Sequence, residues 1–177
     1  LTREHLGRTQ WQHLTTHSQY VSELAVRLGE ALGSDEGDLE RLRVAGLGHD
    51  LGKFLIPEEV LAKRGALSEE ERALLSRHAG DGAEMFLMLA ADPAAADYIR
   101  SHHARCDGPG AADGRSHPIP RGARILGVAD ALVAMTSYRP YQPKRSFTGA
   151  IRELERESGG QFDAEVVAAA SRGVLSD

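Results

Sequence analysis

The stretch GHDLGKFLIP, residues 48–57, places a histidine, an aspartate and a lysine in a segment that is otherwise small or apolar. Burying such side chains without partners carries a large desolvation cost. A lone inward histidine is nevertheless more often a hydrogen-bonded core residue than a metal ligand. Whether His49, Asp50 and Lys53 indicate a functional site therefore depends on which polar side chains elsewhere in the chain accompany them.

On both sides of this stretch, apolar residues recur at steps of three and four, as on one face of a helix. Seven longer segments are expected to be helical, together with a short one after Pro57; the longer segments cover residues 11–32, 35–47, 68 to beyond 78, 92–93 onward, 121–138, 148–157 and 163–173. Nothing alternates for long with the two-residue period of a strand. The pattern predicts an all-α fold, a single bundle of about seven helices in one domain over residues 1–177.

Capping residues mark several of the predicted helix ends. Asp35 is placed to cap one helix, and Ser68 with Glu71 three residues later forms a capping box. Gly33 is placed to end the first long helix. Along residues 35–47 we expect Leu42 and Leu47 in the core, together with Leu39 and Val44.

Composition narrows the class of protein. With 177 residues, 41% hydrophobic and 27% charged, the chain can bury an ordinary core, and no apolar run approaches the roughly 18 residues that cross a bilayer. A net charge of −5 predicts no general attraction for a nucleic acid polymer. The single cysteine, Cys106, fits a reducing compartment, and we expect a cytosolic protein without membrane insertion.

Five of the eight histidines lie within or beside apolar helical segments: His17, His49, His78, His102 and His103. Imidazoles and carboxylates are the usual ligands of hard or borderline divalent metals. Adjacent side chains on a helix point about 100° apart, so His49 and Asp50, and likewise His102 and His103, cannot face one direction on a helix. Each member of a pair could, however, contact a different one of two neighbouring ions. Metal ions bound by these groups would offset the free-energy cost of burying so many imidazoles and carboxylates.

The ordered set of motifs resembles the HD-GYP domain, a branch of the HD superfamily of metal-dependent phosphohydrolases. The resemblance spans residues 10–175 and rests on HLTTHSQYVSELAVRLG, GHDLGKFLIPEEVLAKRGALSEEE, SRHAGDGAEM, HHARCDGPG, ARILGVADALVAMTSYRPYQP and GGQFDAEVV, in that order. It implies an HD-type helical bundle with a dinuclear metal site in its core. The implied metal ligands are His17, His49, Asp50, His78, His102, His103 and Asp130.

The chain also departs from the family pattern. Gly110, Ala111 and Ala112 stand where the family usually has glycine, tyrosine and proline, and Ala104 replaces a usual glutamate. Val133 stands where many members have an aspartate, and His13 where some have a glutamate that recruits a third metal. These changes favour two metals over three, although His13 lies one helical turn before His17 and can still add a ligand.

The resemblance implies hydrolysis of cyclic di-GMP to linear pGpG, with further cleavage to GMP left open, in bacterial second-messenger signalling. Two divalent ions would share Asp50 and activate a water for attack on phosphorus. The resemblance favours iron or manganese, although the ligand chemistry also suits zinc or nickel. Asp50 and Lys53 are the predicted catalytic residues, since Lys53 can reach a phosphate oxygen. Lys53, Asp107, Arg139 and Lys144 are the predicted substrate-binding residues, with Arg145 a further cation nearby.

Two alternatives stay open from the sequence. The chain can be another HD-type nucleotide phosphohydrolase, since the altered loop at residues 110–112 removes a tyrosine that borders the substrate site in the family. It can also be a catalytically weak domain that binds a nucleotide or a partner protein. Domains of this type are commonly tethered to a sensor or output domain, and the oligomeric state is left open.

Overall fold

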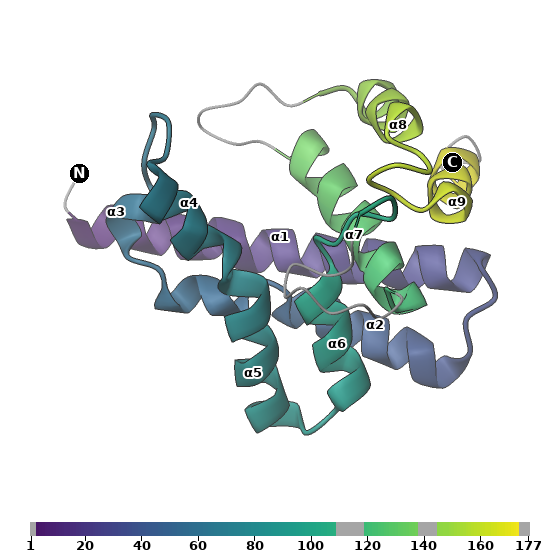
Figure 1. The fold of residues 1–177 in the computed structure, drawn as a ribbon, viewed down its shortest axis with the longest axis horizontal. Coiled ribbons are helices and arrows are strands. Elements are labelled where there is room, and N and C mark those ends of the chain that lie inside the picture. The colour runs from purple at the N-terminus through teal and green to yellow at the C-terminus, as the bar shows by residue number, and fades with distance from the viewer. Residues whose placement is uncertain (1–2, 109–118, 138–144, 174–177) are drawn as a thin grey trace.

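The computed structural model describes residues 3–108, 119–137 and 145–173, and for residues 3–13 the helical backbone alone. These residues form nine α-helices and one 3-10 helix (Figure 1): α1 (Arg3–Ala31), α2 (Glu36–Gly48), η1 (Leu51–Leu55), α3 (Glu58–Leu61), α4 (Glu69–Ser76), α5 (His78–Ala90), α6 (Pro93–Ser101), α7 (Arg121–Thr136), α8 (Phe147–Arg156) and α9 (Ala164–Gly173). In these ranges β pairing is limited to an isolated bridge between Ser158 and Phe162. The predicted all-α fold is confirmed.

Helix α1 is the long axis of the molecule, and the other helices pack around it (Figure 1). Helices α2 and α7 both pack directly on α1, while α5 and α6 lie side by side as a helical hairpin that contacts α2 and α7 through α6. Helices α8 and α9 cover α7 at the C-terminal end. Seven of these helices meet in one core, whose fully buried members include Val21, Leu42, Ile99, Leu126, Leu154 and Val166.

The predicted capping residues are confirmed. The Asp35 carboxylate accepts the Asp38 backbone N–H at 2.8 Å. Ser68 and Glu71 form the reciprocal capping box at the start of α4. Gly33 ends α1 with a φ of +72°, a left-handed conformation that only glycine adopts without strain.

Two expectations about the helices are wrong. The helix predicted from residue 68 to beyond residue 78 is divided at Arg77, where α4 ends and α5 begins in a new direction (Figure 1). The break arises because the His78 ring takes the Leu75 carbonyl, at 2.6 Å, which a continuous helix would offer to the backbone four residues later. Leu47, expected in the core, is 50% exposed because α2 packs through Leu42, Ala45 and Gly46 on other faces.

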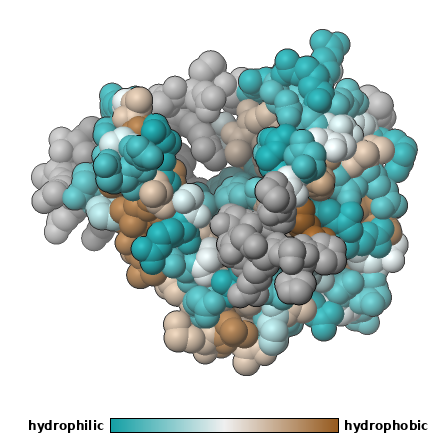
Figure 2. Space-filling view, viewed as in Figure 1, coloured by the Kyte–Doolittle hydropathy of each residue, from teal (hydrophilic) through white to brown (hydrophobic). Residues whose placement is uncertain are grey.

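No helix in the described ranges is long and apolar enough to span a membrane. The face drawn in Figure 2 is mostly hydrophilic, with apolar surface at the lower edge, around the α5–α6 turn of Figure 1. At the end of α5, Met88 and Leu89 are 80% and 77% exposed.

Candidate metal centre

All seven predicted metal ligands converge in the middle of the bundle. They come from five places in the fold: His17 from α1, His49 and Asp50 from the turn between α2 and η1, His78 from the start of α5, His102 and His103 from the end of α6, and Asp130 from α7. They form three overlapping groups of three residues, and in each group the potential ligand atoms lie within 4.8 Å of one another. Residues up to 113 positions apart in sequence are thus brought together, as in the contact between His17 and Asp130.

Three of the histidine rings are oriented by the ends of helices. The Nδ1–H of His49, His78 and His102 donates to the carbonyl oxygen of the residue three positions earlier, at 2.8, 2.6 and 2.6 Å. These carbonyls belong to the last turns of α2, α4 and α6, where the regular backbone pairing of the helix ends. A neutral imidazole that donates from Nδ1 presents a lone pair at Nε2. The three rings therefore face the centre with Nε2, the nitrogen that a metal ion would bind.

That the members of an adjacent pair could each contact a different ion stays a prediction, and the positions of the helix ends bear on it. It assumed helical geometry, but α2 ends at Gly48 and α6 at Ser101, so both pairs lie where the chain leaves the helix. The His102 and His103 ring centroids are 3.8 Å apart, and both rings belong to one group with His78. His49 and Asp50 likewise share a group with His17. One ion can therefore be contacted by both members of a pair.

Asp50 connects the two sides of the centre. Its Oδ2 lies 3.3 Å from His49 Nε2, while its Oδ1 lies 3.7 Å from His78 Nε2. The same Oδ2 accepts a hydrogen bond from Lys53 Nζ at 2.7 Å. Asp50 is 3% exposed and Lys53 is 25% exposed, so the lysine lies at the rim with its ammonium directed inward. A carboxylate in this position can bridge two cations.

Glycines at two contacts allow the ligand-bearing segments to approach. A Cβ on Gly52 would lie 2.0 Å from the His78 carbonyl oxygen and 2.7 Å from the Gly82 nitrogen, so only glycine lets η1 lie against α5. A Cβ on Gly127 would lie 2.5 Å from the His102 carbonyl oxygen. The first contact brings His78 to Asp50, and the second holds the end of α6 against α7, the helix that carries Asp130.

The electrostatics of the centre favour charged carboxylates, and they favour neutral rings at His78, His102 and His103. Burial lowers the pKa of His78, His102 and His103, and for His102 the neighbouring rings lower it further. Burial alone would raise the pKa of Asp50, but His49 and Lys53 hold it well below its usual range, and the His17 hydrogen bond does the same for Asp130. For His49, burial lowers the pKa but the Asp50 carboxylate outweighs it, so the pKa is raised.

The donor set fits divalent cations. His49 Nε2 and His102 Nε2 are buried without a hydrogen-bond partner, which is rare for polar atoms in a folded protein. His78 Nε2 and His103 Nε2 face each other at 3.1 Å. Converging nitrogen lone pairs beside two buried carboxylates are the arrangement that borderline metals such as iron, manganese and zinc accept. A cation between these atoms would satisfy all of them.

The remaining sequence candidates are placed less centrally or are not described. The Asp107 carboxylate is exposed and accepts two hydrogen bonds from Arg105, at 2.8 and 3.0 Å. Its contact with substrate stays a prediction. Arg145 donates to Glu153 at 2.6 Å. Arg139, Lys144, residues 110–112 and the His13 side chain lie outside the described part of the chain. Val133 packs in the core, one turn after Asp130.

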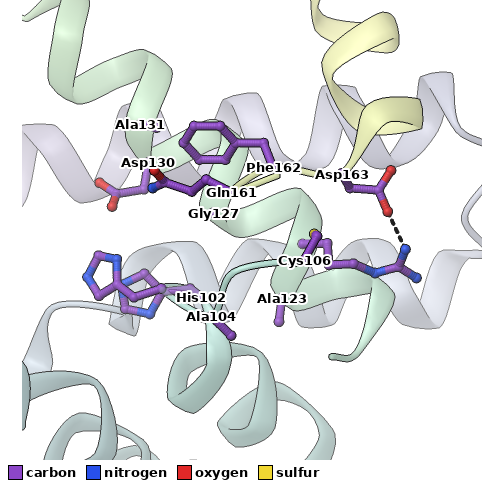
Figure 3. Close-up of a pocket in the computed structure, with 12 residues that line it drawn as sticks. His102, Ala104, Cys106, Ala123, Gly127, Asp130, Ala131, Gln161, Phe162 and Asp163 are labelled. Atoms are coloured by element: carbon purple, nitrogen blue, oxygen red, sulfur yellow. Dashed lines mark hydrogen bonds and ion pairs between the residues drawn. The ribbon is translucent and has the colours of Figure 1, made fainter. Parts of the chain in front are cut away.

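Sequence reasoning assigned no role to Gln161 and Phe162, which line a pocket next to the centre (Figure 3). The pocket shares His102, His103 and Asp130 with the centre. Both residues lie in the segment GGQFDAEVV, which had been noted as typical of the family without a function. A glycine pair before a glutamine and an aromatic residue predicts a turn, but not which part of the fold the turn will face.

Comparison with known proteins supports this arrangement. The family model described as the HD domain matches residues 5–166. A 3'3'-cGAMP-specific phosphodiesterase of Vibrio cholerae is 34% identical over 85% of this chain and 35% of its own length. A cyclic di-GMP phosphodiesterase of Thermotoga maritima is 34% identical over 86% of this chain and 42% of its own length. The chain therefore spans about a third to two fifths of these relatives.

Solved structures agree on the fold. An HDGYP protein of Bdellovibrio bacteriovorus superposes with a TM-score of 0.73 at 20% identity, over 92% of this chain and 53% of the other. At that level of identity the likeness establishes the arrangement of helices. The chemistry has to be argued from the side chains of this chain.

Proposed function

This chain belongs to the HD domain family, as its motifs predict, and we propose that it is a metal-dependent phosphodiesterase that opens a cyclic dinucleotide. The substrate we propose is cyclic di-GMP, hydrolysed to linear pGpG and onward to GMP, in bacterial second-messenger signalling. The observation that carries the proposal is the pair of buried, unpartnered Nε2 atoms of His49 and His102 beside Asp50 and Asp130. A cytosolic location, inferred from the single cysteine, belongs to the same proposal.

We propose two divalent ions per chain, iron or manganese in preference to zinc or nickel. His17, His49 and Asp130 would hold one ion, His78, His102 and His103 the other, and Asp50 would contact both; His49 and His102 also lie close enough to Asp130 to share a cation with it. When bound, such ions lower the pKa of a water and neutralise charge on the phosphate. Asp50 and Asp130 remain ionised at neutral pH because their pKa values are lowered, so the site keeps its attraction for cations.

The protein supplies orientation and charge around the scissile phosphate. The helix-end carbonyls hold the three rings with Nε2 inward, so little reorganisation is needed when substrate binds. Lys53 keeps its ammonium at the rim, 2.7 Å from Asp50, where it can donate to a non-bridging phosphate oxygen. Its charge would then offset the negative charge that grows on that oxygen in the transition state.

The proposed activity is tested by turnover of defined substrates. Protein prepared anaerobically with manganese or iron is expected to contain about two metals per chain and to release pGpG from cyclic di-GMP. Removal of metal with a chelator should abolish product formation, and metal readdition should restore it. The same sample is assayed with 3'3'-cGAMP, cyclic di-AMP and mononucleotides. Turnover of mononucleotides alone would identify another HD-type phosphohydrolase, and saturable binding without product would identify a regulatory binding domain.

Replacing Lys53 by methionine should lower kcat by about a hundredfold, because a preorganised donor to a developing oxyanion is typically worth that much. Metal content should stay unchanged, since the lysine is not among the ligand groups. The matched control is Lys63→Met, which removes a rim lysine that pairs with Glu71 and lies outside the centre. If both variants retain full kcat, Lys53 has no part in the chemical step.

A further inference from the structure

A pocket of about 190 Å³ opens directly beside the candidate metal centre (Figure 3). Its lining includes His102, His103 and Asp130, which also belong to the centre. Gln161 and Phe162 line it as well, and Figure 3 shows them beside Asp130 and across from His102. Pockets for whole drug-sized ligands are typically about 300–1,000 Å³, so this one is large enough for a part of a dinucleotide and too small for all of it.

The wall that carries Gln161 and Phe162 is built rather than adventitious. The Gln161 carbonyl accepts the Cys106 N–H at 3.2 Å, and the Gly160 carbonyl accepts the Asp107 N–H at 2.9 Å. The turn itself is closed by a bond from the Gly159 N–H to the Phe162 carbonyl, at 2.8 Å. These bonds hold the turn against the segment that follows His103, so its side chains have a fixed position relative to the metal ligands.

The chemistry of the lining favours a neutral planar group. Apart from the histidines, the lining residues include one cationic side chain, Arg124. Its guanidinium is paired with Asp163. A phosphate in this pocket would therefore be repelled by the carboxylates of Asp130 and Asp163, and the arginine that could bind it is already paired. The Gln161 amide offers one donor group and one acceptor, and it has no hydrogen-bond partner among the described residues. Phe162 is half-buried and presents an aromatic ring at the same wall (Figure 3).

We propose that this pocket binds one purine base of the substrate, with the edge of the base on the Gln161 amide and its face on Phe162. Amide side chains pair with base edges through a donor and an acceptor, and bases stack on aromatic rings. A phosphate held at the metal centre would place its attached nucleoside next to this pocket, because the two sites share a wall. This inference rests on the proposed function for the identity of the ligand.

The test measures binding and does not depend on turnover. Isothermal titration of the manganese-loaded protein compares GMP and AMP with ribose 5-phosphate, which carries the same phosphate but no base. Wild-type protein is expected to bind at least one of the two nucleotides about tenfold more tightly than ribose 5-phosphate, the typical effect of one stacked base. Gln161→Leu and Phe162→Leu should each reduce this preference at least about threefold. Gln19→Leu, which changes an exposed glutamine of α1, should retain it.

The outcomes separate this inference from the proposed function. Equal affinity of wild-type protein for both nucleotides and ribose 5-phosphate would overturn the base pocket, whatever the turnover assay shows. An unchanged preference in both Gln161→Leu and Phe162→Leu would overturn it as well. Retained base preference in a protein that fails to cleave any cyclic dinucleotide would support the pocket while rejecting the proposed activity. Metal content is measured in each variant, so that a loss of binding through a damaged centre is recognised.

Discussion

Asp50→Asn is expected to lower cyclic dinucleotide turnover by about a thousandfold or more, and to leave the protein with at most one tightly bound metal. Loss of one group that stabilises charge in the transition state already costs about 10²–10³ in rate, and Asp50 faces both sides of the centre. One of its oxygens lies near His49 and the other near His78. An amide has the same shape but carries no charge, so it would bridge two cations poorly.

Metal content and thermal unfolding check this prediction without relying on activity. A ligand present at a hundred times its dissociation constant stabilises the folded state by about 2.7 kcal/mol, so added manganese should raise the Tm of the wild-type protein clearly. Asp50→Asn should show a much smaller shift. Asp97→Asn changes an exposed carboxylate on α6 and should match the wild type. If Asp50→Asn binds two metals and turns over substrate normally, Asp50 is not a metal ligand of the centre.

Gly52→Ala should lower the free energy of unfolding by about 3 kcal/mol, at the upper end of the range for overpacked sites, and should also reduce metal binding. The added Cβ would lie 2.0 Å from the His78 carbonyl oxygen and 2.8 Å from its carbonyl carbon. Both are backbone atoms, so the clash is relieved only if η1 and α5 separate. That separation lengthens the distance between His78 Nε2 and Asp50 Oδ1, which is 3.7 Å in the folded protein.

The matched control for this change is Gly80→Ala. Gly80 lies on α5, two residues after His78, and a Cβ there would meet nothing within 4 Å. Alanine is a better helix former than glycine by about 0.5–1 kcal/mol, so this variant should be slightly more stable than the wild type. Urea unfolding curves of the two variants, with and without manganese, measure both effects. Equal stability of Gly52→Ala and wild type would mean that η1 does not lie against α5 as described.

The sequence was sufficient for the all-α fold and for choosing residues that converge in the bundle. Apolar spacing located the main helical segments, although α4 and α5 were predicted as one helix, and Asp35 and Ser68 marked helix starts correctly. The seven ligands were chosen by motif order, and all seven lie together. Neither result required knowing how the helices cross, because periodicity and capping are local properties of the chain.

The geometry of the centre was beyond sequence reasoning, because it depends on contacts between distant segments. His49, His78 and His102 were expected within or beside helices, but no sequence pattern indicated that each ring bonds to a carbonyl at the helix end before it. The separation of α4 from α5 at Arg77 was also not predictable, since residues 68–90 contain no proline that would signal a helix break. The place of Gln161 in the pocket depends on backbone bonds between residues 106–107 and 160–161, which no local pattern indicates.

The helix-end anchoring of the three rings has a consequence for mutational robustness. The orienting groups are main-chain carbonyls of Gly46, Leu75 and Ile99, and every amino acid supplies a carbonyl. Where a carboxylate orients a ligand, a single codon change can delete it at a typical loss of 10–100-fold in metal affinity; here no side-chain replacement at the anchoring position removes the acceptor. The vulnerable changes are those that move a helix terminus, such as a one-residue insertion or deletion in the last turn of α2, α4 or α6.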